Sequence, residues 1–248
     1  MINFLMVDDI IRLGLKEDIG VGDVTVNAVE PFLKGGVFKF ISKEPFILCG
    51  VDVAKRVFHF LDPNIKVDFC RKDGDWLKKG EKFGEVSGDL RYILMGERVC
   101  LNFLQRLSGI STLTSRYVEK LKNTKTKLLD TRKTTPGHRV LEKYAVKVGG
   151  GFNHRFGLFD GVMLKDNHID AVGSIKKAVE VVRLNVPSTV KIEVETRNLK
   201  EVKEAVAAEV DIIMLDNFPM EDIPKAREIA GMNIKLEISG GVTLENIE

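Results

Sequence analysis

The sequence has few cysteines and no long apolar run. These two features argue against a disulfide-bonded or zinc-binding protein and against a membrane protein. An odd number of scattered cysteines with no Cys-x-x-Cys pair argues against a disulfide framework or a zinc site and favours free thiols in a reducing cytoplasm. No segment approaches the roughly 18 apolar residues of a membrane span. The first residues place two acids by position 9 and build no apolar core of a signal peptide. We therefore expect a cytoplasmic protein without a membrane partner. The three cysteines are Cys49, Cys70 and Cys100.

A large excess of positive or negative residues is also absent, because the sequence has 38 Lys and Arg residues and 36 Asp and Glu residues. The resulting formal net charge of +2 is that of neither a basic nucleic-acid scaffold nor an acidic tail protein. No row of aromatic residues is present for stacking on bases, so nucleic acid is not an expected partner. The 248 residues do contain 44% apolar side chains, enough to bury the core of one large domain or two unequal ones.

Residues 1–107 have the pattern of a small α/β domain. An opening helix precedes two strand-like stretches, "GGVFKFIS" and "NIKVDFCRKDGDWLKKGEKFGEVSG", and an apolar-spaced helix, "VDVAKRVFHFL", lies between these stretches. Glycine, proline and Asp-Gly turns separate the segments and predict an antiparallel sheet. The stretch "GVGD" does not predict a dinucleotide-binding loop, because no strand precedes it and the third glycine is missing.

A long helical stretch, "GERVCLNFLQRLSGISTLTSRYVEKLKN", leads into a different rhythm of short strands and helices. Amphipathic segments such as "GSIKKAVEVVRL" separate the apolar strands, and this alternation predicts parallel strands. Polar residues at the carboxyl ends of the strands favour a TIM-like barrel over a doubly wound sheet. The expected strands are "KLLDT", "GVMLKD", "VKIEVE", "DIIMLD" and "KLEISG".

Charged residues alternate along the middle strand. In "KIEVE", Lys191, Glu193 and Glu195 share one face, and the aliphatic residues take the other. A barrel filled only for stability would carry aliphatic side chains inside, so three inward charges indicate a site, whereas an edge strand with a solvated face is the alternative. Asp216 ends the next strand. Two carboxylates at the ends of adjacent strands suit a hydrated Mg²⁺ ion or the hydroxyls of a sugar.

Basic residues gather where the strands end. The stretch "LLDTRKTTPGHR" alone holds four within eight residues. Taken singly, each of these basic residues is more simply interpreted as an ordinary charged residue of the protein surface. Unit charges ~4 Å apart repel by several kcal/mol at an effective dielectric constant near 20, so a cluster on one rim requires an anion. Arginine forks match carboxylates and phosphates, and the pattern therefore predicts a small ligand with several negative charges. The basic residues are Arg132, Lys133, His138, Arg139, His154, Arg155 and Lys165.

The turn Ser239-Gly240-Gly241 ends the last expected strand and leads into "VTLENI". Its backbone N–H groups, at an expected helix start, would form a phosphate cradle. A plain glycine turn is the alternative.

Several motifs, in this order and spacing, resemble the quinolinate phosphoribosyltransferase family. The resemblance covers essentially the whole chain, and its central block, residues 130–168, is the most specific part. The motifs are "LGLKEDIGVGDVT", "ERVCLNFLQRLSGIST", "DTRKTTPGHRVLEKYAVKVGGGFNHRFGLFDGVMLKDNH", "KIEVE", "DIIMLDN" and "EISGGVT".

The resemblance implies a reaction in NAD biosynthesis: phosphoribosyl pyrophosphate and quinolinate give nicotinate mononucleotide, pyrophosphate and CO₂, with Mg²⁺ as cofactor. It also implies an N-terminal α/β sandwich-like domain, residues 1–107, that covers the substrate pocket and makes dimer contacts. An incomplete TIM-like α/β barrel, residues 108–248, would follow as the phosphoribosyltransferase domain. The expected assembly is a homodimer or a higher even-numbered homo-oligomer.

The resemblance also implies roles for particular residues. Quinolinate would be bound by Arg132, Arg155 and Lys165, with His154 beside them. Glu195 and Asp216 would bind the ribose hydroxyls and, through water, the Mg²⁺ ion. The full substrate-binding set is Arg98, Arg132, Lys133, His154, Arg155, Lys165, Glu195, Asp216, Ser239 and Gly240, and the expected catalytic residues are Lys133, Lys165, Glu195 and Asp216.

Other implied roles concern the donor and the neighbouring subunit. Lys133 would line the pocket and contact phosphoribosyl pyrophosphate, and Ser239 and Gly240 would help to bind its 5′-phosphate. Arg98 would reach the site of the neighbouring subunit, or else form an ordinary helix-terminus ion pair with Glu97. The roles left open for Arg139 and Lys143 are to order the loop or to contact the donor.

The chain departs from the family pattern at its end. The family normally continues past "EISGGVTLENI" into another strand and a phosphate loop, whereas this sequence stops at Glu248. We therefore expect five barrel strands, either because the chain is a shortened product or because the last strand is absent. Rival functions are a relative with the same scaffold and another acceptor, such as the molybdenum-transport-associated paralogues, a Schiff-base lyase that uses Lys165, and an RNA-binding role.

Overall fold

The computed structural model describes residues 2–248. The chain forms two compact units, Met1–His154 with Glu248, and Arg155–Ile247. Among the described residues, no helix combines the length and the apolar character that crossing a bilayer requires.

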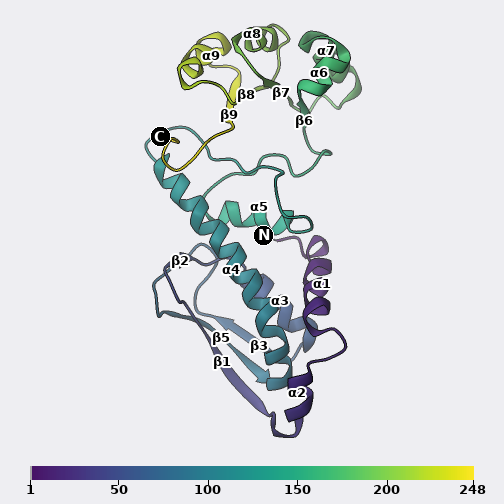
Figure 1. Ribbon diagram of the computed structural model, residues 1–248, viewed down its shortest axis with the longest axis vertical. Coiled ribbons are helices and arrows are strands. Elements are labelled where there is room, and N and C mark those ends of the chain that lie inside the picture. Colours follow the sequence, from purple (N-terminus) through teal and green to yellow (C-terminus); the bar gives the residue numbers. More distant parts are fainter. Residues whose placement is uncertain (1) are drawn as a thin grey trace. The chain divides into compact units, whose positions relative to one another are not determined.

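The first unit holds the expected antiparallel sheet, with strand order β1-β5-β3, and a second sheet of two short strands, β2 and β4 (Figure 1). The expected opening helix and the expected helix between the strands are confirmed as α1 and α3. The elements of this unit are η1 Phe4–Met6, α1 Asp8–Ile19, α2 Val24–Val29, η2 Glu30–Phe32, β1 Gly35–Ile41, β2 Phe46–Ile47, α3 Val51–Leu61, β3 Lys66–Phe69, β4 Trp76–Leu77, β5 Lys82–Asp89, α4 Leu90–Lys120 and α5 Arg139–Val148.

Helix α4 is the longest element of the first unit. It begins earlier than the pattern predicted, because Asp89 caps it by accepting a hydrogen bond from the backbone N of Arg91 at 2.9 Å. A close approach to α3 depends on Gly96, where an added Cβ would lie 2.8 Å from Leu61 Cδ1 and 2.9 Å from Phe58 Cε1. The packing of α4 against α3 thus explains a glycine inside a long helix.

The strand expected at residues 127–131 is not formed. Leu129 makes only an isolated parallel bridge to Phe152. Two backbone hydrogen bonds define this bridge: Phe152 N donates to Leu128 O at 2.8 Å, and Asp130 N donates to Phe152 O at 3.0 Å. The partner segment offers one residue for pairing, so the apolar run lacks the neighbour that a strand needs. This prediction was wrong.

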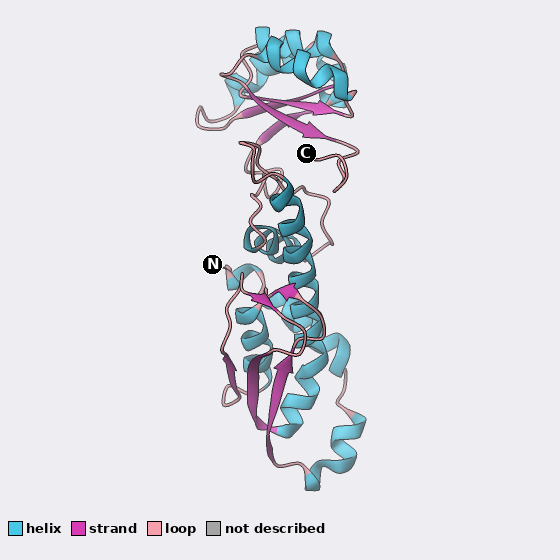
Figure 2. Cartoon of the chain, turned by 90° about the vertical axis from the view of Figure 1, so that its left-hand side faces the viewer, coloured by secondary structure: helices cyan, strands magenta, loops and turns pink. Residues whose placement is uncertain are grey.

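The second unit contains a parallel sheet with strand order β6-β7-β8-β9, which confirms the predicted alternation of strands and helices. Helices α6 to α9 lie on one face of this sheet (Figures 1 and 2). The elements are β6 Val162–Leu164, α6 Asp166–Val172, α7 Ile175–Asn185, β7 Ile192–Thr196, α8 Leu199–Ala207, β8 Ile212–Asp216, η3 Met220–Asp222, α9 Ile223–Ala230 and β9 Lys235–Ser239.

Side-chain alternation along β7 follows the prediction within the strand. Ile192 and Val194 are fully buried in the apolar core of the second unit. Glu193 and Glu195 therefore take the face that points away from α6–α9. Strand β7 is hydrogen-bonded on both sides, which excludes an edge strand. Lys191 was wrongly grouped with the inward residues, because it precedes the strand and is exposed.

The segment "VTLENI" does not begin a helix. Asn246 instead closes a turn, since its Oδ1 accepts from the backbone N of Thr243 at 2.7 Å and its Nδ2 donates to Gly241 O at 2.9 Å. These side-chain bonds compete with helical hydrogen bonding, so the expected helix start was wrong.

Candidate active site

The carboxyl ends of β6 to β9 bring four of the predicted residues to one edge of the sheet. Lys165 directly follows β6, Glu195 lies one residue before the end of β7, and Asp216 ends β8. Ser239 ends β9 and is paired in register with Asp216. Because neighbouring parallel strands run in the same direction, all four strand ends meet at the same edge, where α/β proteins bind their ligands.

Lys165 and Glu195, at the ends of the neighbouring strands β6 and β7, contact each other. Lys165 Nζ donates to Glu195 Oε2 at 2.7 Å, and the two side chains are 46% and 14% exposed. The start of α6 fixes the backbone of Lys165, whose N donates to His168 Nδ1 at 3.0 Å. This edge therefore presents a cation and an anion side by side to a ligand.

Asn217 organises the other half of this edge and was missed by the sequence analysis. Its Nδ2 donates to Asp216 Oδ2 at 3.1 Å, and its backbone N donates to Ser239 O at 2.8 Å. Gly240 has a φ of 93°, and an added Cβ would lie 2.1 Å from Asn217 Oδ1. A glycine is required there by both backbone conformation and space. The available signal was the "LDN" sequence at a strand end.

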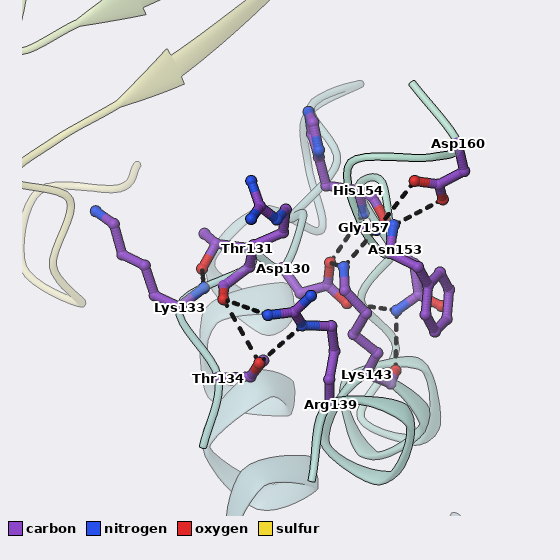
Figure 3. A network of polar contacts seen from close by, with 12 residues as sticks. Asp130, Thr131, Lys133, Thr134, Arg139, Lys143, Asn153, His154, Gly157 and Asp160 are labelled. Atoms are coloured by element: carbon purple, nitrogen blue, oxygen red, sulfur yellow. Dashed lines mark hydrogen bonds and ion pairs between the residues drawn. The ribbon is translucent and has the colours of Figure 1, made fainter. Parts of the chain in front are cut away.

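Arg155 belongs to the loop before β6. Its Nη1 donates to Gly161 O at 2.9 Å. Asp160 closes the loop, because it accepts from the backbone N of Phe156 at 2.7 Å and from that of Gly157 at 3.0 Å. Asp160 and Gly157 are shown in Figure 3. The bond to Gly161 thus ties the guanidinium to its own loop.

The first unit holds the remaining predicted cations, and two of them, Arg132 and Lys133, lie in the loop between α4 and α5. Arg132 Nε is buried and has no hydrogen-bond partner among residues 2–248. An unsatisfied buried donor on a charged group is costly, and a bound anion would remove the cost. Lys133 is exposed and points away from Asp130 and Lys143 (Figure 3). These two neighbours differ: Arg132 has a buried, unsatisfied donor, whereas Lys133 is open to solvent.

Arg139 orders this loop from the first turn of α5. Its Nε donates to Thr134 Oγ1 at 3.0 Å, and its Nη2 donates to Arg132 O at 3.3 Å. His138, the third basic residue of the motif along the chain, is a different case. Burial, together with the nearby Arg106 guanidinium, lowers the pKa of His138. Its imidazole therefore holds a proton less readily than a free imidazole, which reduces what it adds to the positive charge of the motif.

His154 is anchored through its backbone. Its N donates to Asp130 Oδ1 at 2.9 Å, and its carbonyl O accepts from Lys143 Nζ at 3.0 Å (Figure 3). Lys143 also forms an ion pair with Asp130 and is completely buried. Sequence patterns gave no sign of Asp130 and Asn153, which complete this network.

Arg98 lies on α4 and is exposed. It makes no hydrogen bond or ion pair with any described residue, including Glu97. Its position well inside the helix excludes the helix-terminus pair that the sequence left open. The predicted residues are therefore divided between the two units, and Arg98, on α4, belongs to the first.

Comparison with known families settles the relationship. The family models described as quinolinate phosphoribosyl transferase, N-terminal and C-terminal domain, match residues 23–108 and 110–248. The chain belongs to the quinolinate phosphoribosyltransferase family. The two family domains meet inside α4, which spans Leu90–Lys120.

Quinolinate phosphoribosyltransferase relatives match almost the whole chain. It is 44% identical over 247 residues to a probable nicotinate-nucleotide pyrophosphorylase (carboxylating) of Bacillus subtilis, covering 99% of this chain and 84% of that relative. A chloroplastic nicotinate-nucleotide pyrophosphorylase (carboxylating) of Arabidopsis thaliana is 45% identical to this chain. The match includes 96% of this chain and 73% of that relative.

Solved structures agree with this family assignment. The NadC structure from Streptococcus pyogenes has a TM-score of 0.95 and 42% identity, covering 100% of this chain and 87% of that one. The nicotinate-nucleotide pyrophosphorylase of Francisella tularensis gives a TM-score of 0.95 and 43% identity, with the same coverage. The predicted fold class is confirmed: the chain is mixed α/β, with a small sheet domain followed by a parallel-sheet α/β domain. Four of the five strands expected for the incomplete TIM-like barrel form among residues 2–248.

The Mg²⁺ ion implied by the quinolinate phosphoribosyltransferase resemblance requires oxygen ligands. Glu195 is paired in register with Met214, and Asp216 lies two residues further along β8 on the same face. The two carboxylates thus sit on adjacent strands and face the same side. This donor set fits a hard, partly hydrated divalent ion.

Proposed function

We propose that the chain transfers the phosphoribosyl group of phosphoribosyl pyrophosphate to quinolinate and releases CO₂, giving nicotinate mononucleotide and pyrophosphate. The observation that carries this proposal is the edge formed by Lys165, Glu195, Asp216 and Ser239, in a chain that matches the family throughout. Such an edge offers a cation for a carboxylate and acids for a sugar.

The acceptor is a pyridine with two carboxylates, and the proposed residues supply cations that can bind both carboxylates. Arg132, Arg155 and Lys165 supply the cations, and His154 directly precedes Arg155 in the sequence. The buried Arg132 Nε, which has no partner within residues 2–248, supports this assignment, because a carboxylate oxygen is the acceptor that it lacks. A second carboxylate distinguishes quinolinate from nicotinate, so the pocket should discriminate between them.

The donor is assigned to the acids and to the glycine turn. Glu195 and Asp216 would accept hydrogen bonds from the ribose hydroxyls, and Ser239 and Gly240 would bind the 5′-phosphate. Lys133, exposed in the first unit, would contact the pyrophosphate. Ammonium and backbone N–H groups suit phosphate oxygens, whereas carboxylates suit hydroxyl donors.

The proposed mechanism needs no general base. The nucleophile is the pyridine nitrogen, which attacks with a lone pair and has no proton to lose. The residues therefore act by holding two anions in line and by stabilising charge while pyrophosphate leaves an oxocarbenium-like ribose. The alkylated ring nitrogen then carries a positive charge, which stabilises the carbanion left when CO₂ departs. A proton taken up from solvent water at this ring carbon completes nicotinate mononucleotide.

A Mg²⁺ ion held by Glu195 and Asp216 through water would neutralise negative charge on the departing pyrophosphate. Lys165 Nζ supplies charge to the same carboxylate, Glu195, at 2.7 Å. The ammonium group of Lys165 thus balances part of the negative charge of Glu195.

We also propose a homodimer or a higher even-numbered oligomer, and a location in the cytoplasm. Arg98 is exposed without a partner in the described chain, which suits a residue that completes the site of a second copy. The cysteines are free thiols, and Cys49 and Cys100 are buried, which suits a reducing compartment.

The rival functions fit less well. A Schiff-base lyase needs a neutral amine, whereas Lys165 forms an ion pair with Glu195. RNA phosphates would meet Glu195 and Asp216 at the same edge and be repelled. A relative with another acceptor would have little use for arginines that match a second carboxylate.

Product formation tests the proposal. The protein is incubated with phosphoribosyl pyrophosphate, Mg²⁺ and quinolinate, and nicotinate mononucleotide is measured by chromatography while CO₂ release is followed from carboxyl-labelled quinolinate. We expect both products in equal amounts, and no mononucleotide when nicotinate replaces quinolinate. Equal turnover of nicotinate would contradict the proposed acceptor.

A further inference from the structure

Lys143 is a lysine with no access to solvent. Its side chain is 0% exposed, and that of its ion-pair partner Asp130 is 6% exposed. Lysine is almost never fully buried unless it is paired. Replacing a buried ion pair by apolar residues is often neutral or stabilising, so the pair is not explained by stability alone.

Asp130 joins three segments of the chain. It accepts hydrogen bonds from Lys143 Nζ on α5, from the backbone N of His154 at 2.9 Å and from Asn153 Nδ2 (Figure 3). Asn153 Nδ2 also donates to Lys143 O at 2.9 Å. Lys143 in turn donates to His154 O at 3.0 Å, so both backbone polar groups of His154 are held. We call Asp130, Lys143 and Asn153 the Asp130 clamp.

The clamp acts on the same loop as Arg139. Arg139 and Lys143 are four residues apart on α5 and therefore project from the same face of the helix. Arg139 holds the carbonyl of Arg132 at 3.3 Å, while Lys143 holds Asp130 and His154. One helix face thus fixes the backbone on both sides of the loop that carries Arg132.

We propose that the Asp130 clamp positions the acceptor-binding residues: it sets the separation between Arg132 and His154 that quinolinate requires. This inference rests on the proposed function. Its members would not contact the substrate, because Lys143 is fully buried and its ammonium is committed to Asp130 and His154. A displacement of about 1 Å in such a supporting shell is enough to cost up to ~100-fold in activity.

The first test compares Lys143→Met with Lys147→Met, which removes an exposed lysine one turn further along α5. Quinolinate and phosphoribosyl pyrophosphate are titrated separately by calorimetry, and unfolding temperatures are recorded. We expect Lys143→Met to weaken quinolinate binding by about 10- to 100-fold, the usual effect of losing a supporting residue. Donor binding should change by less than about threefold, and Lys147→Met should resemble the wild type.

Asn153→Ala provides a second route, because it loosens the clamp without leaving a buried charge. We expect a folded protein with quinolinate binding weakened about tenfold and a raised KM for quinolinate at nearly unchanged KM for the donor. A purely structural role would instead lower the active fraction and leave both KM values unchanged. Wild-type quinolinate affinity in either folded variant would overturn the inference, as would equal losses for both substrates or a failure of both variants to fold.

The wild-type titration separates the two proposals. If the wild type binds quinolinate and the variants bind it equally well, the inference alone fails. If the wild type binds no quinolinate, the proposed function fails, and the inference fails with it.

Discussion

Lys165 and Glu195 join the carboxyl ends of two neighbouring strands through an ion pair of 2.7 Å. The lysine is 46% exposed, so the pair lies where a ligand could reach it. Partly exposed pairs of this kind contribute little to stability, typically ~0–1 kcal/mol. The pair is therefore better explained by what it offers a ligand than by what it adds to the fold.

This relationship predicts a separation of activity from stability. Lys165→Met should lower kcat/KM by about 100-fold or more, because the acceptor loses a cation, yet shift the unfolding temperature by only ~1–3 °C. Lys200→Met is the matched control, since Lys200 also faces a glutamate of the second unit, Glu204, at 3.8 Å, and is 87% exposed. A parallel fall in activity and unfolding temperature for Lys165→Met would assign the lysine to the fold.

Asp216 is predicted to govern the metal requirement. Asp216→Asn removes one negative charge from the carboxylate pair, so the Mg²⁺ concentration for half-maximal activity should rise about tenfold. The hydrogen bond from Asn217 survives in a variant of equal size, which limits structural change. The measurement is a Mg²⁺ titration of activity with saturating substrates. An unchanged titration curve would remove Asp216 from the metal site.

Arg98 is predicted to act in the site of a second copy. Arg98→Ala and Arg132→Ala should each be nearly inactive, because each site then lacks one of its cations. When the two variants are mixed, up to about half of the sites in mixed dimers contain both arginines, and activity should reappear accordingly. The assay is activity against mixing ratio, with mixed dimers confirmed by differently tagged chains. Mixed dimers that remain inactive would show that Arg98 does not act across subunits.

His138 predicts a dependence of stability on pH. Burial and Arg106 lower its pKa in the folded state from the usual 6.5, so the unfolded chain binds more protons as the pH falls through this range. Stability from this group is complete above about pH 6.5 and is lost as the pH drops towards the lowered folded pKa. His138→Gln should therefore lose less stability than the wild type between about pH 7 and pH 5.5, measured by denaturant unfolding. An equal loss in both proteins would exclude His138 as the source.

The sequence predicted the parts of the fold that depend on local periodicity. Alternation in β7 correctly placed Glu193 and Glu195 opposite Ile192 and Val194, because side chains in a strand alternate strictly between its faces. The polar residues at the carboxyl ends of β6 and β8, Lys165 and Asp216, also fell where expected, since the carboxyl ends of parallel strands share one edge.

Features that depend on distant partners were not predictable. The apolar run around Leu129 looked like a strand, but among the described residues it pairs with Phe152 alone, so pairing stops after one bridge. Lys143 looked like any basic residue of a helix, and its complete burial depends on Asp130, thirteen residues earlier. Neither feature could be predicted from the residues that neighbour it in the sequence.

The central claim is that the cations exist to bind a pyridine with two carboxylates. Calorimetric titration of the wild-type protein with quinolinate, and with nicotinate as the control, tests this most directly. The account predicts saturable binding of quinolinate and affinity at least ~100-fold lower for nicotinate, which leaves one set of charged hydrogen bonds unmade. Equal affinity for the two acids, or no binding of quinolinate, would contradict it.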